Sequence, residues 1–289
     1  MPLGAAASFE PHRRHLMAVA YRMLGSLVEA EDAVQEAYLR WHDTDRAKVR
    51  NPEAFLTRTV MRLCLDQIKS ARRRREAYVG PWLPEPVLES ATLDAGSASD
   101  YAQDLSVALM LTLERLSPLE RAAFLLHDVF DVGFVEIAET LGRNEEACRQ
   151  LAARGRAHVR GARPRFNPSS EDNAKLLAAF KEAAESGNAA GLAAYLAKDA
   201  VLLADGGGKR PAALNPIEGA DHIVRLIEGL GRKLAGPFRL RDTPINGMPG
   251  FIVTGPDGSI ETIAFDVAGG KIVAIYNVRN PDKLRRVAP

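Results

Sequence analysis

Apolar positions recur at helical spacing through the first quarter of the chain. One such segment ends at Gly25, a second runs from Val28 to Trp41, and a third opens at Asn51-Pro52. Glycine favours a helix end, whereas asparagine followed by proline is typical of a helix start. In each segment the apolar residues fall on one side, as they do when helices pack together. We therefore predict an all-α domain over residues 9–76.

The helical pattern stops between residues 77 and 104. This segment contains YVGPWLPEP, is rich in Pro, Gly, Ser and acidic residues, and has no helical period. Such a composition predicts a linker. The segment nevertheless contains Trp82, Leu83, Val87 and Leu88. Apolar side chains of this size need a surface to cover them, so we expect part of the linker to dock.

A second helical region spans residues 105–163. Ser117-Pro118 separates two helices, and after Gly133 two further helices are separated by Gly142, with Asn144 as the cap of the second. This order is the signature of a helix-turn-helix. From Arg149 to Arg165 there are six arginines and no acidic residue. The pattern predicts a DNA-binding helix, and a solvated basic face on a helical bundle is the open alternative.

The side chains at the start of the second helix are the candidates for reading bases. Arg149 can bond guanine in a bidentate way, Gln150 suits adenine, and glutamate can accept from cytosine. Arginines further along the helix are better placed for phosphates. The predicted contact residues are Arg143, Glu145, Glu146, Arg149, Gln150, Arg154, Arg156 and Arg160.

From residue 170 the pattern changes to mixed helix and strand. Two helical segments and the short strand AVLLAD precede a third helix, GADHIVRLIEGLGRKL. The alternating segments FRLRDTPI, GFIVTGPDG, SIETIAFDV and KIVAIYNV follow, joined by Asn-Gly, Asp-Gly and Gly-Gly. These dipeptides are hairpin signals. We predict an α+β domain over residues 170–287.

Composition narrows the class of protein. The chain has 289 residues, 46% hydrophobic and 26% charged residues and a formal net charge of +1, which is ordinary for a globular multidomain protein. Cys64 and Cys148 are far apart, and each lies in a helical pattern, so we expect reduced core residues. No apolar stretch approaches the ~18 residues of a membrane span, and the start of the chain lacks a signal peptide. We expect a cytoplasmic protein without a metal site or cofactor.

The stretch LADGGGKRP has the look of a phosphate-binding loop. A P-loop needs Gly, four residues, and then Gly-Lys followed by Ser or Thr. Here Gly208-Lys209 is followed by Arg210, and the position five before Gly208 is Leu203. The register fails at both ends, so no nucleotide site is predicted.

Several motifs together resemble a known family. AEDAVQEAYLRW, FLTRTVMRLCLDQIKSARRRR and the helix-turn-helix after LSPLERAAFLLHDVFD resemble extracytoplasmic-function RNA polymerase sigma factors over residues 9–163. YVGPWLPEP, DGGGK and NPDKL resemble the subgroup with a fused C-terminal SnoaL-like domain, of the nuclear-transport-factor-2-like superfamily. The resemblance implies two all-α domains, sigma regions 2 and 4, and a cone-shaped α+β domain. It also implies a non-enzymatic subunit that directs polymerase to −10 and −35 promoter elements.

The resemblance also implies roles for particular residues. Those expected to dock on the β′ clamp of core polymerase are Asp32, Gln35, Glu36, Leu39 and Arg40. Those expected at the −10 element are Arg62, Asp66, Lys69, Arg72 and Arg73, although many relatives have Asn at the position of Arg62. The helix-turn-helix is expected to read the −35 element, and its domain to meet the β flap.

A last implied site joins the linker to the C-terminal domain, which would modulate activity in cis. Its expected members are Trp82, Leu83, Pro84, Glu85, Pro86, Asp205, Gly206, Gly207, Gly208, Lys209, Asn280, Pro281, Asp282, Lys283 and Leu284. We expect Trp82 to be the apolar anchor, and the glycine loop with Lys209 to meet the acidic WLPEP segment. A plain surface hairpin is the open alternative for this loop.

Two other functions stay open at this point. SnoaL-like folds include enzymes with an Asp/His pair, and here His222 could pair with Asp205 or Asp266. The chain would then be a small-molecule enzyme or ligand sensor with a DNA-binding appendage, and an unknown small ligand remains a candidate partner. The other alternative is a stand-alone helix-turn-helix repressor, which would bind DNA without polymerase.

Overall fold

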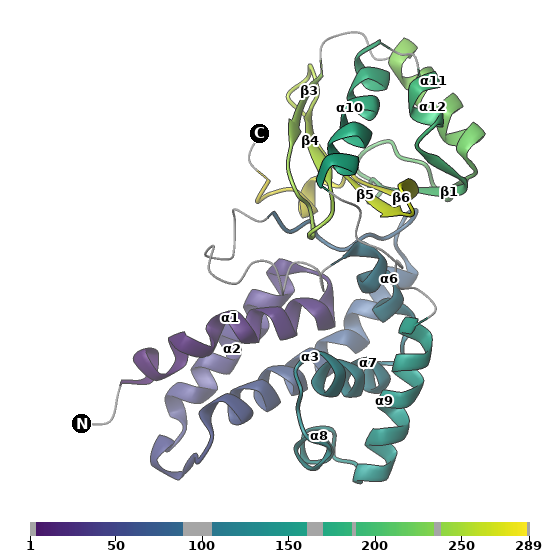
Figure 1. Cartoon of the computed structure of the whole chain (residues 1–289). Coiled ribbons are helices and arrows are strands. Elements are labelled where there is room, and N and C mark those ends of the chain that lie inside the picture. Colours follow the sequence, from purple (N-terminus) through teal and green to yellow (C-terminus); the bar gives the residue numbers. More distant parts are fainter. Residues whose placement is uncertain (1–3, 89–105, 161–169, 187–188, 234–237, 288–289) are drawn as a thin grey trace. The chain divides into compact units, whose positions relative to one another are not determined.

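The computed structural model describes residues 4–88, 106–160, 170–186, 189–233 and 238–287 (Figure 1). Side chains at residues 69–76, 170–172, 184–185, 190 and 231–233 lie outside this description. The chain divides into two compact units, one of residues 1–77 and 109–162 and the other of residues 78–108 and 163–289. The domain boundaries drawn from the sequence stay a prediction.

The first unit begins with the helices expected from the apolar pattern. They are α1 (Ala5–Leu24), α2 (Leu27–Asp43), the 3-10 turn η1 (Arg46–Lys48) and α3 (Pro52–Glu76). Gly25 ends α1 in a left-handed conformation with φ of 69°, and Ser26 accepts the Glu29 N–H at 3.3 Å to begin α2. Asn51 accepts the Ala54 N–H at 3.1 Å at the start of α3. The predicted helix end at Gly25 and helix start at Asn51 are confirmed, and α2 extends one residue before and two residues beyond the predicted Val28–Trp41.

The same unit contains the helix-turn-helix. Its elements are α6 (Val107–Arg115), α7 (Pro118–Phe124), the π-helical turn η2 (Leu125–Val129), α8 (Phe134–Leu141) and α9 (Glu145–Arg160). Gly142 is left-handed with φ of 62°, and Asn144 accepts the Ala147 N–H at 2.8 Å. Gly155 lies where a Cβ would come within 2.9 Å of the Phe124 Cβ. Gly155 therefore permits close packing of α9 against α7.

The second unit is the predicted α+β fold. Its elements are α10 (Ser170–Ser186), α11 (Ala190–Ala193), β1 (Leu196–Asp205), β2 (Ile217–Glu218), α12 (Ala220–Lys233), β3 (Arg239–Asp242), β4 (Gly250–Thr254), β5 (Ile260–Ala268), β6 (Lys271–Val278) and the 3-10 turn η3 (Pro281–Lys283). In the described residues the sheet has six strands in the order β2-β1-β6-β5-β4-β3. β1 and β6 are parallel, and the other neighbours are antiparallel.

Two details of this unit differ from the sequence prediction. β1 is longer than AVLLAD, since it begins at Leu196, and the helix expected before it shortens to Ala190–Ala193. Asn246-Gly247 is the turn between β3 and β4, as predicted, because the Ile245–Met248 bridge continues the antiparallel register of the Asp242–Phe251 pair. β2 was not predicted, because a strand of two residues has no readable alternation.

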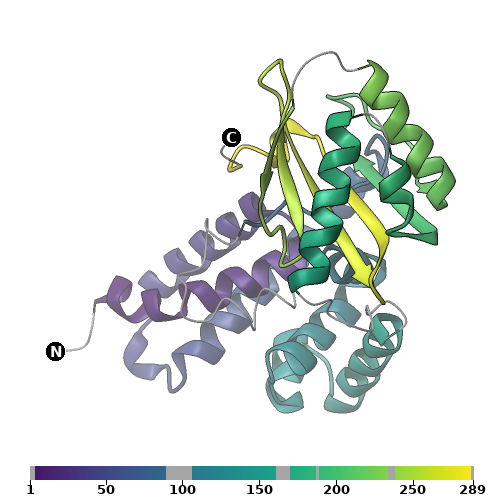
Figure 2. The same cartoon turned by 45° about the horizontal axis from the view of Figure 1, so that its top comes forward.

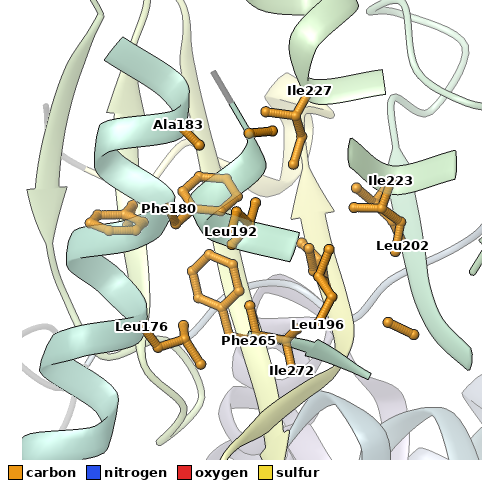
Figure 3. Close-up of a cluster of buried hydrophobic side chains, with 14 of the residues drawn as sticks. Leu176, Phe180, Ala183, Leu192, Leu196, Leu202, Ile223, Ile227, Phe265 and Ile272 are labelled. Carbon is orange, nitrogen blue, oxygen red and sulfur yellow. The ribbon is translucent and has the colours of Figure 1, made fainter. Parts of the chain in front are cut away.

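Helices α10, α11 and α12 cover one face of the sheet (Figures 1 and 2). The core between them is filled by apolar side chains, among which Phe180 of α10 meets Phe251 and Phe265 with ring centroids 5.7 and 4.8 Å away (Figure 3). On β1, Leu202 and Ala204 belong to this core. Because side chains alternate along a strand, Asp205 points to the face of the sheet away from the helices.

Candidate functional site: a docked linker and a basic helix

The carboxylate of Asp205 is the centre of a polar cluster at the end of β1. Its side chain is 0% exposed. One oxygen accepts the Tyr78 hydroxyl at 2.6 Å, and the other accepts the Leu83 N–H at 2.9 Å and the Lys283 ammonium at 2.7 Å. A buried carboxylate is costly unless donors and a cation surround it, and here both are present. Asp205 therefore holds two linker residues against the C-terminal domain.

The segment NPDKL meets the linker at the same place. The Asp205 carbonyl accepts the N–H groups of Arg279 at 2.7 Å and Asn280 at 2.9 Å. The Asn280 side chain accepts the Asp282 N–H at 3.1 Å and donates to the Tyr78 oxygen at 2.6 Å. Burial, followed by the hydrogen bond to Asp205, raises the pKa of the Tyr78 phenol. Tyr78 therefore stays protonated and serves as a donor to Asp205.

Lys283 adds a cation to the linker contact. Besides the Asp205 carboxylate, its ammonium reaches the Leu83 carbonyl oxygen and lies 4.3 Å from the centre of the Trp82 ring system. That distance is within the range of a cation–π interaction. Leu83 is fully buried, whereas Trp82 is half-buried. The expectation that Trp82 is the apolar anchor is wrong: the adjacent Leu83 fills the apolar site, and Trp82 lies over the cation.

The glycines of DGGGK make a tight loop. The Gly206 carbonyl accepts the N–H groups of Lys209 at 3.0 Å and Arg210 at 3.1 Å. Gly207 has φ of 59°, and a Cβ there would overlap the Asn280 side chain. Lys209 pairs with Asp282 and lowers the pKa of that carboxyl. The expectation that Lys209 pairs with the acidic linker is therefore wrong. Its partner is Asp282 of η3, which lies next to the loop.

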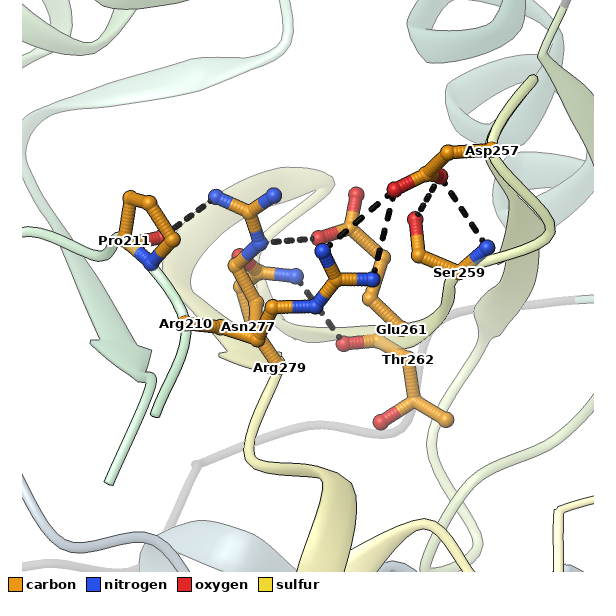
Figure 4. Close-up of polar contacts among 8 residues, drawn as sticks. All are labelled: Arg210, Pro211, Asp257, Ser259, Glu261, Thr262, Asn277 and Arg279. Atoms are coloured by element: carbon orange, nitrogen blue, oxygen red, sulfur yellow. Dashed lines mark hydrogen bonds and ion pairs between the residues drawn. The ribbon is translucent and has the colours of Figure 1, made fainter. Parts of the chain in front are cut away.

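The far end of the loop is tied to the sheet (Figure 4). Arg210 donates to Asp257 at 3.3 Å, and Arg279 reaches the Pro211 carbonyl and the Glu261 carboxylate, both at 2.6 Å. The Ser259 hydroxyl and N–H, followed by Arg210, hold the pKa of Asp257 at about 2. Asn277 of β6 donates to the Thr262 carbonyl at 3.3 Å. These contacts fix the loop from both ends.

The rest of the described linker runs beside the Asn246 turn. Asn246 accepts the Val87 N–H at 3.1 Å and donates its own N–H to the Val87 carbonyl at 2.8 Å. Leu88 forms a β-bridge with Ile245. Pro84, Glu85 and Pro86 are buried in between. Sequence reasoning missed Asn246, because an Asn-Gly pair indicates a turn and not what the turn binds.

The arginines of α9 are less free than the sequence suggests. Arg156 forms two hydrogen bonds to Asp128 at 2.6 and 3.0 Å, and Arg154 pairs with Glu120 at 2.7 Å. Arg149 pairs with Glu145 at 2.7 Å and lies 5.1 Å from the Phe134 ring centre. The arginine-rich segment has no acidic residue of its own, but in the fold its arginines pair with acidic residues of α7 and η2. Of the other predicted contact residues, Arg143, Glu146, Gln150 and Arg160 are exposed.

The residues implied for polymerase and the −10 element lie on α2 and α3. On α2, Asp32, Gln35, Leu39 and Arg40 are exposed, and Glu36 pairs with Arg40 at 3.0 Å. On α3, Asp66 is exposed, while Arg62 donates to carbonyl oxygens of α8. The side chains of Lys69, Arg72 and Arg73 lie outside those that the structure describes.

The residues considered for catalysis are engaged elsewhere. His222 is exposed, and its Nδ1 hydrogen-bonds the Glu218 carbonyl at 2.7 Å. Asp205 binds the linker, and burial raises the pKa of Asp266. Across the described residues, no group of three or more His, Cys, Asp or Glu is arranged to hold a metal ion. Nor does any described helix have the length and apolarity to cross a membrane.

Comparison with known proteins agrees with both halves of the chain. Residues 9–74 match the profile of Sigma-70 region 2, and residues 106–159 match that of Sigma-70, region 4. The chain is 40% identical to the ECF RNA polymerase sigma factor SigJ of Mycobacterium tuberculosis, over 96% of this chain and 92% of that protein. It is 28% identical to the probable ECF RNA polymerase sigma factor SigI of the same species, over 96% of this chain and 94% of that protein.

A solved structure shows the same fold. The crystal structure of the Mycobacterium tuberculosis extracytoplasmic function sigma factor SigJ superposes with a TM-score of 0.78 and 36% sequence identity. The match covers 97% of this chain and 98% of that chain. It therefore includes the helical regions and the C-terminal mixed sheet.

Proposed function

This chain belongs to the extracytoplasmic-function RNA polymerase sigma factors, and on that premise we propose that its C-terminal domain modulates promoter recognition in cis through the docked linker. As a sigma factor it directs core RNA polymerase to promoters. Region 2 and region 4 are joined by the chain that contains residues 78–88. Holding part of that chain limits how far the two regions can separate. The relative placement of the regions decides which −10 to −35 spacing they fit.

The Asp205 cluster is the observation that carries this proposal. It ties Tyr78 and Leu83 to β1 and Lys283 by a buried, fully hydrogen-bonded carboxylate. Such a contact fixes the position of the linker, because each hydrogen-bond donor must lie in one direction from a carboxylate oxygen. A plain surface hairpin would not need to bury a carboxylate, whereas the Asp205 side chain is 0% exposed. The loop thus supports an intramolecular role rather than a plain surface hairpin.

The contacts with polymerase and DNA are also part of the proposal. The exposed face of α2 around Asp32, Gln35 and Leu39 is proposed to dock on the β′ clamp, and the region 4 domain on the β flap. Arg149 and Gln150 are proposed to read bases of the −35 element, and Arg62 and Asp66 to serve at the −10 element. The exposure of Asp32, Gln35 and Leu39 on α2 supports docking on the β′ clamp, and the exposure of Arg149 and Gln150 on α9 supports reading of the −35 element.

We further propose that the C-terminal domain has no catalytic role and that the protein works in the cytoplasm, where core polymerase meets promoter DNA. The engagement of Asp205 by the linker supports the first statement, because the same carboxylate would be needed beside His222 for acid–base chemistry.

Transcription in vitro tests the proposal. Full-length wild type, Asp205→Asn and the matched control Asp199→Asn, at an exposed position of the same strand, are each added to core polymerase on promoters whose −10 to −35 spacing varies. Wild type and Asp199→Asn should initiate at one narrow spacing, and Asp205→Asn should initiate over a broader range. Initiation that needs no core enzyme, or the same spacing profile for all three proteins, would contradict the proposal.

A further inference from the structure

The guanidinium of Arg62 lies at the C-terminal end of α8. Its Nη2 donates to the Glu139 carbonyl at 2.7 Å, and its Nε donates to the Thr140 carbonyl at 3.2 Å. The last carbonyls of a helix lack partners within the helix and carry a partial negative charge. A guanidinium that bonds two of them is therefore a favourable contact between α3 of region 2 and the helix-turn-helix.

A second arginine makes the reciprocal contact. Arg121 of α7 is 3% exposed and donates to the Met23 carbonyl at 2.6 Å, at the C-terminal end of α1. The same Arg121 nitrogen lies 2.7 Å from Glu114. Each of the two regions thus presents an arginine to a helix end of the other. Because Arg121 is buried, this contact excludes water and is not a loose surface encounter.

Further contacts surround the two arginines. Arg58 pairs with Glu139 at 2.8 Å, one helical turn before Arg62 on α3. Arg22 lies 5.3 Å from the Phe130 ring centre, and the His15 ring meets Phe130 edge-on at 5.1 Å. Cationic, aromatic and helix-end contacts therefore occur together in one interface within the first unit.

We propose that the Arg58–Arg62 face of α3 is an intramolecular docking surface for α8, and that Arg62 exchanges the α8 carbonyls for promoter DNA when the two regions separate. The second half of this proposal rests on the proposed −10 role of Arg62. A phosphate or base that binds Arg62 in the bidentate way through Nε and Nη2 would use the N–H groups that the Glu139 and Thr140 carbonyls now accept. At that edge of the guanidinium the two bound states exclude each other, so docking of α8 lowers the apparent affinity for the −10 strand.

Charge reversal at Glu139 opens this surface without altering a residue proposed to touch DNA. Glu139→Lys places a third cation beside Arg58 and Arg62, and the Glu139 side chain is 55% exposed, so the fold should tolerate it. Glu136→Lys makes the same charge change on an exposed position of the same helix and is the matched control. Arg58→Glu combined with Glu139→Lys restores the ion pair with the charges exchanged.

The distance between the regions is measured in the full chain without DNA or polymerase. Spin labels on Ala47→Cys and Ala157→Cys, both at exposed positions, report it by pulsed electron resonance, and the native Cys64 and Cys148 are buried. Wild type and the Glu136→Lys variant should give one narrow distribution, and the Glu139→Lys variant a broader and longer one. The charge-exchanged double variant should return to the narrow distribution. If Glu139→Lys melts early, Arg58→Gln provides the same opening.

Binding of a single-stranded −10 oligonucleotide tests the exchange. Glu139→Lys should bind at least about fivefold more tightly than wild type, the lower end of usual coupling between sites. The gain should vanish when Arg62→Gln is added. An unchanged distance distribution in Glu139→Lys, or equal broadening in Glu136→Lys, would overturn the docking surface. Broadening without a gain in affinity would overturn the exchange.

The −10 role itself is tested separately. Arg62→Gln in holoenzyme should reduce transcription, and a normal level would refute the proposed −10 role while leaving the distance measurement valid.

Discussion

The side chain of Leu83 offers the sharpest test of linker docking. It is 0% exposed, and its N–H and carbonyl are both bonded, to Asp205 and Lys283. Replacing a buried leucine by alanine costs about 2–5 kcal/mol, through lost burial and the cavity that remains. The backbone bonds survive in Leu83→Ala, so the lower part of that range is the reasonable expectation, about 2–3 kcal/mol.

Amide hydrogen exchange locates this loss. The Val87 N–H and the Asn246 N–H bond across the linker and the turn, and neither residue is altered by the substitution. A loss of 2 kcal/mol from the opening free energy raises their exchange rates about 30-fold, since each 1.4 kcal/mol is about tenfold. Amides in the β5–β6 ladder should change less, because the linker can leave before the sheet opens.

Val79→Ala is the matched control. Val79 lies in the same linker but is 52% exposed, so its truncation should change the same exchange rates by less than about fivefold, or about 1 kcal/mol. Equal rates in wild type and Leu83→Ala would refute the reasoning, as would an effect of Val79→Ala as large as that of Leu83→Ala. Either result would mean that the buried side chain does not hold the linker.

Three further predictions concern other parts of the chain. Gly207→Ala should release the linker as Leu83→Ala does, since φ of 59° is strained for alanine and its Cβ would overlap Asn280. In the same exchange assay, the double variant should lower the opening free energy by less than the sum of the two single effects. Arg149→Ala should relax base preference at one −35 position by about 1–3 kcal/mol, and an unchanged preference in a transcribed promoter library would reject that role. Burial lowers the pKa of His15 below 6.5, so its neutral form favours the folded state. The charged neighbours of His15 are Glu53, which raises this pKa, and His12 and Arg22, which lower it. As pH falls below 6.5 the unfolded state takes up the proton first, so the free energy of unfolding should fall; urea titrations at about pH 5.5 and 7.5 should show a smaller difference for His15→Gln than for wild type.

The helices, their ends and the kind of fold follow from local patterns in the sequence. Gly25, Asn51, Ser117 and Asn144 act on residues within four positions, so local chemistry is enough to place a helix boundary. The motifs of the helical regions and of the C-terminal domain were also enough to indicate the family. The physical reason is that these interactions are short in range: a cap or a periodic apolar face depends on neighbouring residues and not on distant segments.

Which side chains meet depends on how distant segments of the chain fold together. Leu83 rather than Trp82 is buried, and Lys283 rather than Lys209 meets the linker, because β1 brings Asp205 beside a segment 78 residues later and another 122 residues earlier. The arginines of α9 meet acids from α7 and η2 for the same reason. Charge and polarity in a sequence state what a residue can bind, whereas the partner is fixed by chain segments that fold next to it. Pairing across such separations leaves no local pattern to read.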